Sequence, residues 1–400
     1  MMKMINKIKM RVIIILYNIS KIIKKRNDLW LFGAWEGQLY SDNSKYLFEY
    51  VNKEHPEINA IWISRNKNVV EKLKNKGYKA YYYKSFEYFI NAMRAAVVFQ
   101  TEGNQDFGYA IYGGARIIQL WHGAGPKINK WDTDKFTSKD TRKRGISNYF
   151  EESYWMCPSE RYMTQLTTMP MFYIPLSKDK MYLTGLPRND TFVSKPKSEF
   201  LENFRTQHGD AKLIVYMPTH RNFGKEEAIP EFSIDALKKV NDFLKERNYF
   251  MLYKPHFHEL KKYANVEFEK TMDHIILAKD AEIFGDPYQY LHGCDMMISD
   301  YSSVLYDFIC SGKPVVLFPF DIDKFDKDDA GLEDYYLDVP PGPICYSWDE
   351  VFTKTDELFK QDLWVEKREK SRKLLHNFID GKNCERVYNS VIEIIKKEHI

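Results

Sequence analysis

Residues 286–323 constrain the fold of this 400-residue chain more than any other stretch. Met296–Ile298 is a short apolar run, which predicts a buried strand. The polar quartet 300–303 follows at once, and Val304–Cys310 carries apolar residues at helical spacing. A second apolar run, Val315–Phe320, predicts the next strand. This order predicts a β-α-β unit with a hydroxyl-rich turn at the carboxyl end of a strand, where open α/β sheets bind ligands.

The turn itself has the chemistry of a phosphate site. Ser302 and Ser303 fall where a helix N-cap belongs. Backbone N–H groups and the positive end of the helix dipole favour a phosphate there. Asp307 lies about one turn into the helix, from where it could reach a ribose hydroxyl beyond the phosphate. A capped helix without a ligand has the same pattern, so the pattern alone leaves both interpretations open.

The length of the chain suggests two domains, at roughly 100–200 residues each. Hydrophobic residues make up 44% of the sequence and charged residues 29%, as in an ordinary folded protein. The five cysteines are scattered, with no CxxC pair and no metal-ligand spacing. Their distribution predicts reduced thiols in a cytosolic setting.

The first 26 residues are basic and amphipathic. They hold eight Lys and Arg residues and no acid, and removing those eight charges from the net charge of +3 leaves −5 for the rest. This balance argues against a broad nucleic-acid-binding surface, so we predict no nucleic-acid partner. The longest apolar run, Val12–Tyr17, is far too short to span a bilayer. We predict that residues 1–28 form a basic amphipathic helix on an anionic membrane surface, with a helix packed on the protein as the alternative.

Residues 29–120 alternate short apolar runs with helical patterns. Strands separated by helices of about ten residues imply a parallel sheet. The predicted strands are Leu29–Trp35, Ala60–Ser64, Ala80–Tyr83, Ala95–Gln100 and Arg116–Leu120, and the predicted helices are Ser44–Asn52, Val69–Lys76 and Ser85–Arg94.

A histidine and two glycines follow the last of these strands, within Trp121–Lys127. Such a tight loop can expose the His122 imidazole to a cleft and bring backbone N–H groups close to an anion. Histidine is the side chain best suited to accept a proton near neutral pH. A lone histidine is more often structural, but Gly123 and Lys127 beside it favour a functional site.

Beyond a predicted domain boundary near residues 195–197, three strands end in polar side chains. These are Thr219 and Arg221 after Lys212–Tyr216, Lys254 and His256 after Phe250–Tyr253, and Ser302 and Ser303 after Met296–Ile298. Because the carboxyl ends of parallel strands meet at one edge, these residues predict a cationic pocket for a diphosphate. The turn 184–190 carries Arg188 just before the boundary. Residues 348–400 are mostly helical, and we predict that they pack back on the first domain.

Taken in this order, these residues resemble the CDP-glycerol glycerophosphotransferase family, the teichoic-acid polymerases and primases. The matching pieces are QLWHGAGPK (119–127), TGLPRND (184–190), YMPTHR (216–221), YKPH (253–256), DPYQYLHGCDMMISDYSSVLYDF (286–308), KPVVLFPFDID (313–323) and PPGPI (340–344). The match runs from about residue 30 to residue 380.

The resemblance implies an α/β fold of two Rossmann-like domains facing a cleft, as in GT-B enzymes. Residues 29–195 would be the acceptor domain and residues 196–347 the domain that binds a CDP-alditol. The implied reaction moves an alditol phosphate, glycerol phosphate above all, to a hydroxyl of a membrane-bound teichoic-acid or capsule-type acceptor and releases CMP. The implied enzyme is peripheral, on the cytoplasmic face of the cell membrane.

The resemblance also implies roles for single residues. His122 and His256 are expected to be catalytic, with His122 as the base. The expected substrate-binding residues are Gly123, Lys127, Arg188, Thr219, Arg221, Lys254, Ser302, Ser303 and Asp307.

The chemistry that remains open concerns metal, donor and acceptor. No paired-aspartate motif is evident, so we expect helix N-termini and basic side chains to neutralise the phosphate charge, with Mg²⁺ left open. The acceptor is expected to be a lipid-linked polyol phosphate or glycan. The alternatives are a CDP-ribitol ribitolphosphotransferase, a nucleotide-sugar glycosyltransferase or epimerase on the same fold, and a non-catalytic membrane-surface protein.

Overall fold

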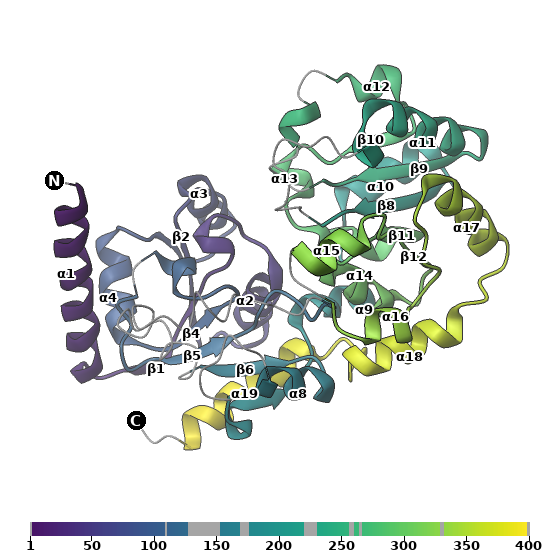
Figure 1. Ribbon diagram of the computed structural model, residues 1–400. Helices are drawn as coiled ribbons and strands as arrows, with labels where there is room; N and C mark the ends of the chain where they lie inside the picture. Colours follow the sequence, from purple (N-terminus) through teal and green to yellow (C-terminus); the bar gives the residue numbers. More distant parts are fainter. Residues whose placement is uncertain are drawn as a thin grey trace.

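Two open parallel sheets, one in each half of the chain, form the frame of the molecule (Figure 1). The computed structural model describes residues 2–108, 110–126, 153–168, 176–219, 230–255, 260–263, 266–328 and 332–397. Every strand pair within each sheet is parallel. The predicted α/β class with two Rossmann-like sheets is therefore confirmed.

The first sheet has seven strands in the order β3-β2-β1-β4-β5-β6-β7. Their bounds are β1 Arg26–Phe32, β2 Asn59–Ser64, β3 Ala80–Tyr82, β4 Ala95–Gln100, β5 Arg116–Gln119, β6 Tyr154–Cys157 and β7 Met181–Leu183. The first strand was predicted to continue to Trp35, but β1 ends at Phe32. The chain turns there because Trp35 and Glu36 both adopt left-handed backbone angles, with φ of 49° and 50°.

Helices cover both faces of this sheet, which is why its strands are buried on both sides. The helices are α1 Met2–Ile22, α2 Asp42–Glu54, α3 Lys67–Asn75, α4 Phe86–Arg94 and α8 Glu160–Thr168. Along β1, Trp30 packs with α2 and α3 on one face, and Leu31 packs with α4 on the other. This alternation follows from the two-residue period of a strand.

The second sheet has five strands in the order β10-β9-β8-β11-β12. Its strands are β8 Lys212–Met217, β9 Tyr249–Tyr253, β10 Ile275–Leu277, β11 Met296–Ser299 and β12 Val315–Leu317. The helices around it are α9 Thr191–Ser194, α10 Glu199–His208, α11 Ile234–Glu246, α12 Phe268–Thr271, α13 Ala281–Phe284, α14 Ser303–Phe308, α15 Ile322–Asp328 and α16 Tyr335–Asp338. The predicted β-α-β unit of residues 286–323 is thus β11-α14-β12. The strand order reverses between β8 and β11, which makes their carboxyl ends the switch point of this sheet.

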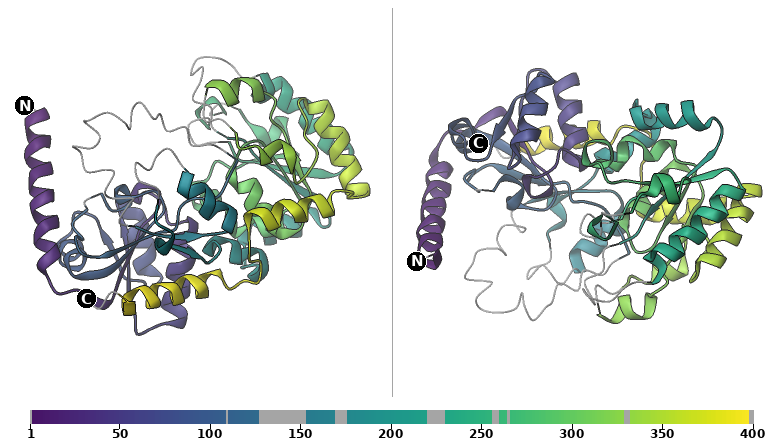
Figure 2. Two further views of the ribbon diagram at one scale, coloured as in Figure 1. Left: turned by 60° about the horizontal axis from the view of Figure 1, so that its bottom comes forward. Right: turned by 90° about the horizontal axis from the view of Figure 1, so that it is seen from above.

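The C-terminal helices are divided between the two halves (Figures 1 and 2). They are α17 Trp348–Lys360, α18 Val365–Leu375 and α19 Asn383–Lys397. Val387 and Val391 of α19 lie in the first-half core, beside α2. The expectation that all of residues 348–400 pack on the first domain is wrong for α17, because its apolar face, with Val351 and Leu358, is buried in the second-half core.

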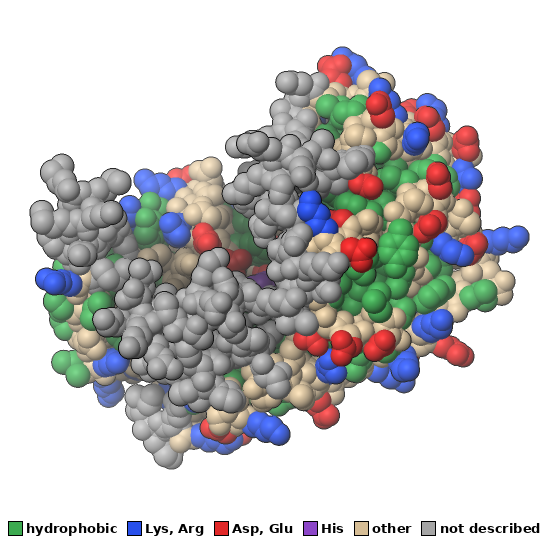
Figure 3. All heavy atoms as spheres, viewed as in Figure 1, with side chains coloured by type: hydrophobic (Ala, Val, Ile, Leu, Met, Phe, Trp, Pro, Cys, Tyr) green, Lys and Arg blue, Asp and Glu red, His purple; other side chains and the backbone are tan. Residues whose placement is uncertain are grey.

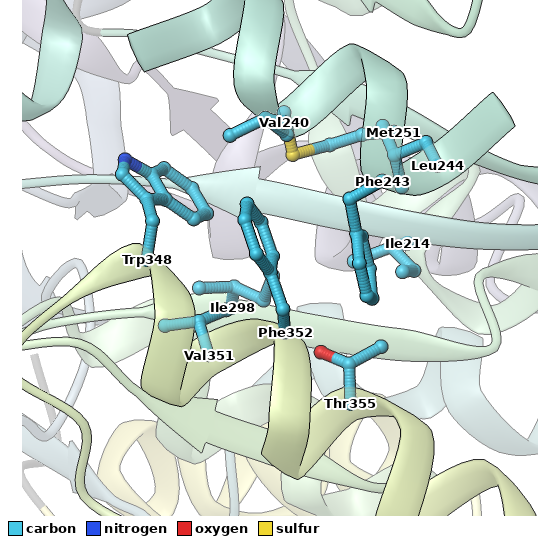
Figure 4. A pocket seen from close by; sticks show the side chains of 10 residues that line it. All are labelled: Ile214, Val240, Phe243, Leu244, Met251, Ile298, Trp348, Val351, Phe352 and Thr355. Carbon is cyan, nitrogen blue, oxygen red and sulfur yellow. The ribbon is translucent and has the colours of Figure 1, made fainter. Parts of the chain in front are cut away.

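A cavity of about 10 Å³ lies between α11, α17 and the second sheet (Figure 4). Its walls include Phe243, Phe352 and Thr355. A void of this size is at the lower limit for a single water molecule. It is therefore a small packing gap, and a ligand site must lie elsewhere.

Among residues 11–22, the part of α1 whose side chains the structure describes, one face of the helix is docked on the first half. The Ser20 hydroxyl donates to the Gly113 carbonyl at 2.8 Å, and a Cβ added to Gly113 would lie 2.1 Å from the Tyr17 carbonyl oxygen. The close approach explains the glycine. Another face of the helix carries an exposed apolar stripe, Val12 (48%), Ile15 (57%), Ile19 (42%) and Ile22 (86%). Within the described ranges, no helix combines the length and the apolar character that crossing a bilayer requires.

Candidate active site

The His122 loop follows β5 at the carboxyl edge of the first sheet. The His122 ring stacks on Trp121 with centroids 4.2 Å apart, and its Nδ1 lies 3.2 Å from the Thr101 carbonyl oxygen. A carbonyl oxygen can only accept, so Nδ1 carries the hydrogen in this contact and Nε2 has the lone pair. The neutral imidazole is therefore held in the tautomer that can take up a proton at Nε2.

The same loop meets the second half at the N-terminus of α14. A Cβ added to Gly123, whose φ is +129°, would lie 2.5 Å from the Ser303 hydroxyl oxygen, and one added to Gly125 would lie 3.0 Å from the Ser303 Cβ. Gly123 is thus needed for this close approach, and the absence of a side chain at Gly125 leaves further room for Ser303. The predicted base loop and the predicted phosphate turn, about 180 residues apart, are brought together at the base of an interdomain cleft.

The switch point of the second sheet is built from the ends of β8 and β11. The Asp300 carboxylate accepts the Thr219 N–H, with donor–acceptor distances of 2.9 and 3.1 Å. Ser302 is the N-cap residue of α14, but its hydroxyl oxygen accepts no capping hydrogen bond from the backbone N–H groups of this described helix. Ser302 and Ser303 are both partly exposed. The predicted positions of Thr219, Ser302 and Ser303 therefore lie along one edge.

Lys254 directly follows β9 at this edge and is partly buried. Burial lowers the pKa of its ammonium group, and the negative charge of Asp286 partly opposes that shift. Asp286 itself accepts from Lys45 at 2.6 Å and from the Tyr46 hydroxyl at 2.8 Å, both on α2 of the first half. This ion pair ties the first half of the chain to the second close to Lys254.

Arg188 and Asp307 form a buried ion pair between the two halves. The Arg188 Nη2 lies 2.5 Å from the Asp307 carboxylate and its Nη1 lies 2.7 Å from Asp42. Asp307 also accepts from the Tyr288 hydroxyl at 2.6 Å and from the Asn189 amide at 3.1 Å, and it is fully buried. The expectation that Asp307 reaches a ribose is therefore wrong, because protein donors already occupy its carboxylate. The guanidinium of Arg188 is likewise engaged by carboxylates rather than directed at a phosphate.

Carboxyl groups gather near the His122 loop, because Thr101 contacts both Asp106 and His122, and the sequence analysis missed this feature. Figure 3 shows acidic side chains near a histidine in a hollow between the two halves. Burial, followed by the charges of Asp106, Glu36 and Asp42, raises the pKa of Glu102 to about 7. Burial raises the pKa of Asp106 to about 6, although its carboxylate accepts the N–H groups of Thr101 and Glu36 at 2.8 Å. These carboxyls lie in loops after β1 and β4, where no sequence motif marks them.

Three predicted site residues, Lys127, Arg221 and His256, lie outside the described residues. In the part of the chain that the structure describes, no group of three or more His, Cys, Asp or Glu side chains could hold a metal ion. Two contact residues that the analysis missed, Asp42 and Asn43, begin α2. The sequence feature that could have pointed to these two residues is the capping-type run Ser41-Asp42-Asn43, which precedes a helical pattern.

Comparison with known proteins identifies the family. The family model described as CDP-Glycerol:Poly(glycerophosphate) glycerophosphotransferase matches residues 15–393. The chain belongs to this family. Its members are transferases, and the resemblance drawn from the sequence motifs is thereby confirmed.

Curated relatives support the same family. A teichoic acid poly(glycerol phosphate) polymerase of Staphylococcus epidermidis (strain RP62A) is 28% identical over 340 residues, which are 78% of this chain and 43% of the polymerase. A teichoic acid glycerol-phosphate transferase of Staphylococcus aureus (strain NCTC 8325 / PS 47) is 26% identical over 351 residues, 82% of this chain and 84% of the transferase. This glycerophosphotransferase-family chain thus spans less than half the length of the first relative.

The fold is that of a solved family member. The structure of the wall teichoic acid polymerase TagF superposes with a TM-score of 0.78 over 99% of this chain and 97% of the other, at 22% sequence identity. At this identity the likeness establishes the fold alone. The GT-B-like arrangement expected from the sequence is confirmed by it.

Proposed function

We propose that this glycerophosphotransferase-family chain transfers an alditol phosphate, glycerol phosphate above all, from a CDP-alditol to a hydroxyl of a lipid-linked teichoic-acid or capsule-type acceptor. The observation that carries the proposal is the contact between the His122 loop and the N-terminus of α14, where Gly123 and Gly125 allow Ser303 to approach. A base on one half and a phosphate-binding turn on the other would hold acceptor and donor on opposite sides of one cleft. Residues 29–195 would then serve the acceptor and residues 196–347 the donor.

The proposed reaction is an in-line displacement at the phosphorus that bears the alditol. The acceptor oxygen bonds to that phosphorus, the bond from phosphorus to the CMP oxygen breaks, and CMP leaves with the electron pair. His122 Nε2 takes the acceptor proton, because Thr101 holds the ring in the required tautomer. Positioning and charge stabilisation dominate phosphoryl transfer, so we assign Ser302, Ser303, Thr219 and Lys254 to the diphosphate. Arg221 keeps the donor-binding role expected from the sequence, and His256 keeps its expected place in the diphosphate pocket together with its expected catalytic role.

The donor is tested by measuring the nucleotide released from CDP-glycerol, CDP-ribitol and UDP-sugars with one acceptor preparation. We expect CMP from CDP-glycerol. Release of CMP from CDP-ribitol alone would make the chain a ribitolphosphotransferase, and release of UDP would make it a glycosyltransferase. Binding of CDP with no turnover of any donor would favour a non-catalytic protein.

The base is tested by His122→Ala. We expect the rate to fall by about 10²–10⁴-fold, the usual loss when a general base is removed, while calorimetry shows nearly unchanged CDP binding. The donor dissociation constant should change little, because the diphosphate is assigned to the other half. A variant that melts normally, binds CDP normally and retains the wild-type rate would exclude His122 as the base.

We further propose that α1 holds the enzyme at the anionic inner surface of the cell membrane. The support is the exposed stripe formed by Val12, Ile15, Ile19 and Ile22 next to basic residues of the same helix. Lys25, just beyond the C-terminal end of α1, has a different role. The Lys25 ammonium donates to the Met93 carbonyl at 2.7 Å, and burial lowers its pKa to about 8. Lys25 therefore helps to hold the segment that follows α1 against the first half.

A further inference from the structure

Asn43 joins the base loop to the ion pair between the two halves of the chain. It is the second residue of α2 and fully buried. Its Nδ2 donates to the Trp121 carbonyl at 2.9 Å and to the Leu120 carbonyl at 3.3 Å. Its Oδ1 accepts the Arg188 N–H at 3.2 Å. One amide thus holds the peptide directly before His122 and the backbone of the arginine that bridges the two halves.

The peptide held by Asn43 is in an unfavourable conformation. Trp121 has φ of +53°, a region that bulky side chains avoid. Such a residue persists only where the surroundings hold it in place, and residues of this kind cluster at active sites. Trp121 is held from both sides, since its N–H donates to the Gln119 Oε1 at 3.0 Å and its carbonyl accepts from Asn43. The direction in which the next residue, His122, enters the cleft is set by this peptide.

The chemistry of the position requires an amide. Nδ2 must donate to two carbonyl oxygens while Oδ1 accepts a backbone N–H, and among short side chains only asparagine does both. The neighbouring Asp42, with φ of +66°, binds the Arg188 guanidinium at 2.7 Å and so fixes the start of α2 independently. We propose that Asn43 is a positioning residue for His122, which holds the imidazole at the angle needed to take the acceptor proton. The inference rests on the proposed role of His122.

The test compares Asn43→Asp and Asn43→Ala with the wild type. The aspartate has the same shape but cannot donate to the Trp121 and Leu120 carbonyls, and the alanine removes both functions. We expect kcat with CDP-glycerol and acceptor to fall by about 10²-fold in both variants, since a displacement of about 1 Å in a reacting group has an effect of this size. The dissociation constant for CDP should stay within about twofold of the wild type, because the donor pocket is in the other half of the chain.

The matched control is Asn241→Ala. Asn241 is also a buried helical asparagine, on α11, and its Oδ1 accepts the His274 N–H at 2.9 Å, away from the cleft. We expect it to lower the melting temperature without lowering kcat. If Asn43→Asp does not fold, Asn43→Ala gives the same comparison, and a wild-type kcat in either folded variant overturns the proposal.

A double-mutant cycle with His122→Ala separates positioning from general damage. If Asn43 acts through the imidazole, Asn43→Asp should cause no further loss of rate in the His122→Ala background. An equal fold-loss in both backgrounds would show a structural role and overturn the proposal. The His122→Ala arm alone decides the role of the base. A wild-type rate there would refute the base and the positioning role together. A His122→Ala variant that is slowed by about 10²–10⁴-fold, in which Asn43→Asp causes its full additional loss, would refute only the positioning role.

Discussion

At the scale of the residue, the Glu102 carboxyl group lies in a position where its ionisation is unfavourable. Glu102 is partly buried, and burial followed by Asp106, Glu36 and Asp42 raises its pKa to about 7. A raised pKa means that the folded protein binds a proton that the unfolded chain has already released. Between the ordinary glutamate pKa and about 7, stability must therefore fall as the pH rises. The stabilisation that comes from protonated Glu102 is complete below this window and is lost above it.

This sign gives a prediction for Glu102→Gln. We expect the variant to be more stable than the wild type at pH 8 and to differ little at pH 4, because the amide stays neutral at both. Thermal melts from pH 4 to pH 8 measure the difference. Glu71→Gln, at an exposed position on α3, should leave the pH dependence of the wild type unchanged. A Glu102→Gln curve that runs parallel to the wild-type curve would contradict the prediction.

At the scale of the element, α1 carries apolar side chains on two different faces. One face, with the partly buried Ile13 and Leu16, packs against the core cluster to which α4 and the first sheet contribute. The other face leaves Val12, Ile15 and Ile19 in solvent. Exposed apolar stripes of this kind mark contacts with membranes or proteins. Contact with the protein and an exposed apolar stripe therefore coexist in one helix, so the two interpretations of the sequence are compatible.

The triple variant Ile15→Ser, Ile19→Ser, Ile22→Ser tests the exposed face. Each change removes about 1 kcal/mol of transfer free energy, so we expect at least a tenfold weaker partition into vesicles of phosphatidylglycerol. Sedimentation of the protein with these vesicles measures the effect, and phosphatidylcholine vesicles test the contribution of charge. Leu363→Ser, at another exposed apolar position (76%), is the control. Equal sedimentation of triple variant and wild type would refute the membrane role of α1.

At the scale of the whole molecule, buried charges fix how the two halves meet. Arg188 is only 3% exposed and lies between Asp42 of the first half and Asp307 of the second. The Lys45–Asp286 pair, also buried, makes a second link. Removing one partner of a buried ion pair leaves an uncompensated charge, which is far more destabilising than the loss of an exposed pair.

We therefore expect Arg188→Met to lower the free energy of unfolding by about 3–5 kcal/mol. Chemical denaturation gives this value. The control is Arg247→Met in the partly exposed Arg247–Asp356 pair, where the loss should stay below about 1 kcal/mol. If both variants lost the same free energy of unfolding, the interdomain ion pair would stabilise the protein no more than a partly exposed pair does.

Much of the frame could be predicted because it is encoded locally. β4 spans Ala95–Gln100 as the apolar run predicts, and α14 begins at Ser303 after the N-cap residue Ser302. Strand and helix periods, glycines and caps act over a few residues, so they can be seen in the sequence. The His122 loop was identified for the same reason, since its histidine and glycines are adjacent.

What the sequence by itself determined is therefore the parallel α/β architecture, the two sheets and the motifs that mark the family. The tertiary structure alone decided which charges meet. Arg188 is separated from Asp42 by 146 residues and from Asp307 by 119 in the sequence. Arg188 and Asp307 were both expected to contact the substrate, but they bind each other in an interdomain ion pair. The hydrogen bond from Asn43 to Trp121 joins two residues that are 78 positions apart in the sequence. Such pairings depend on how the sheets pack in space, and a local pattern has no information about that packing.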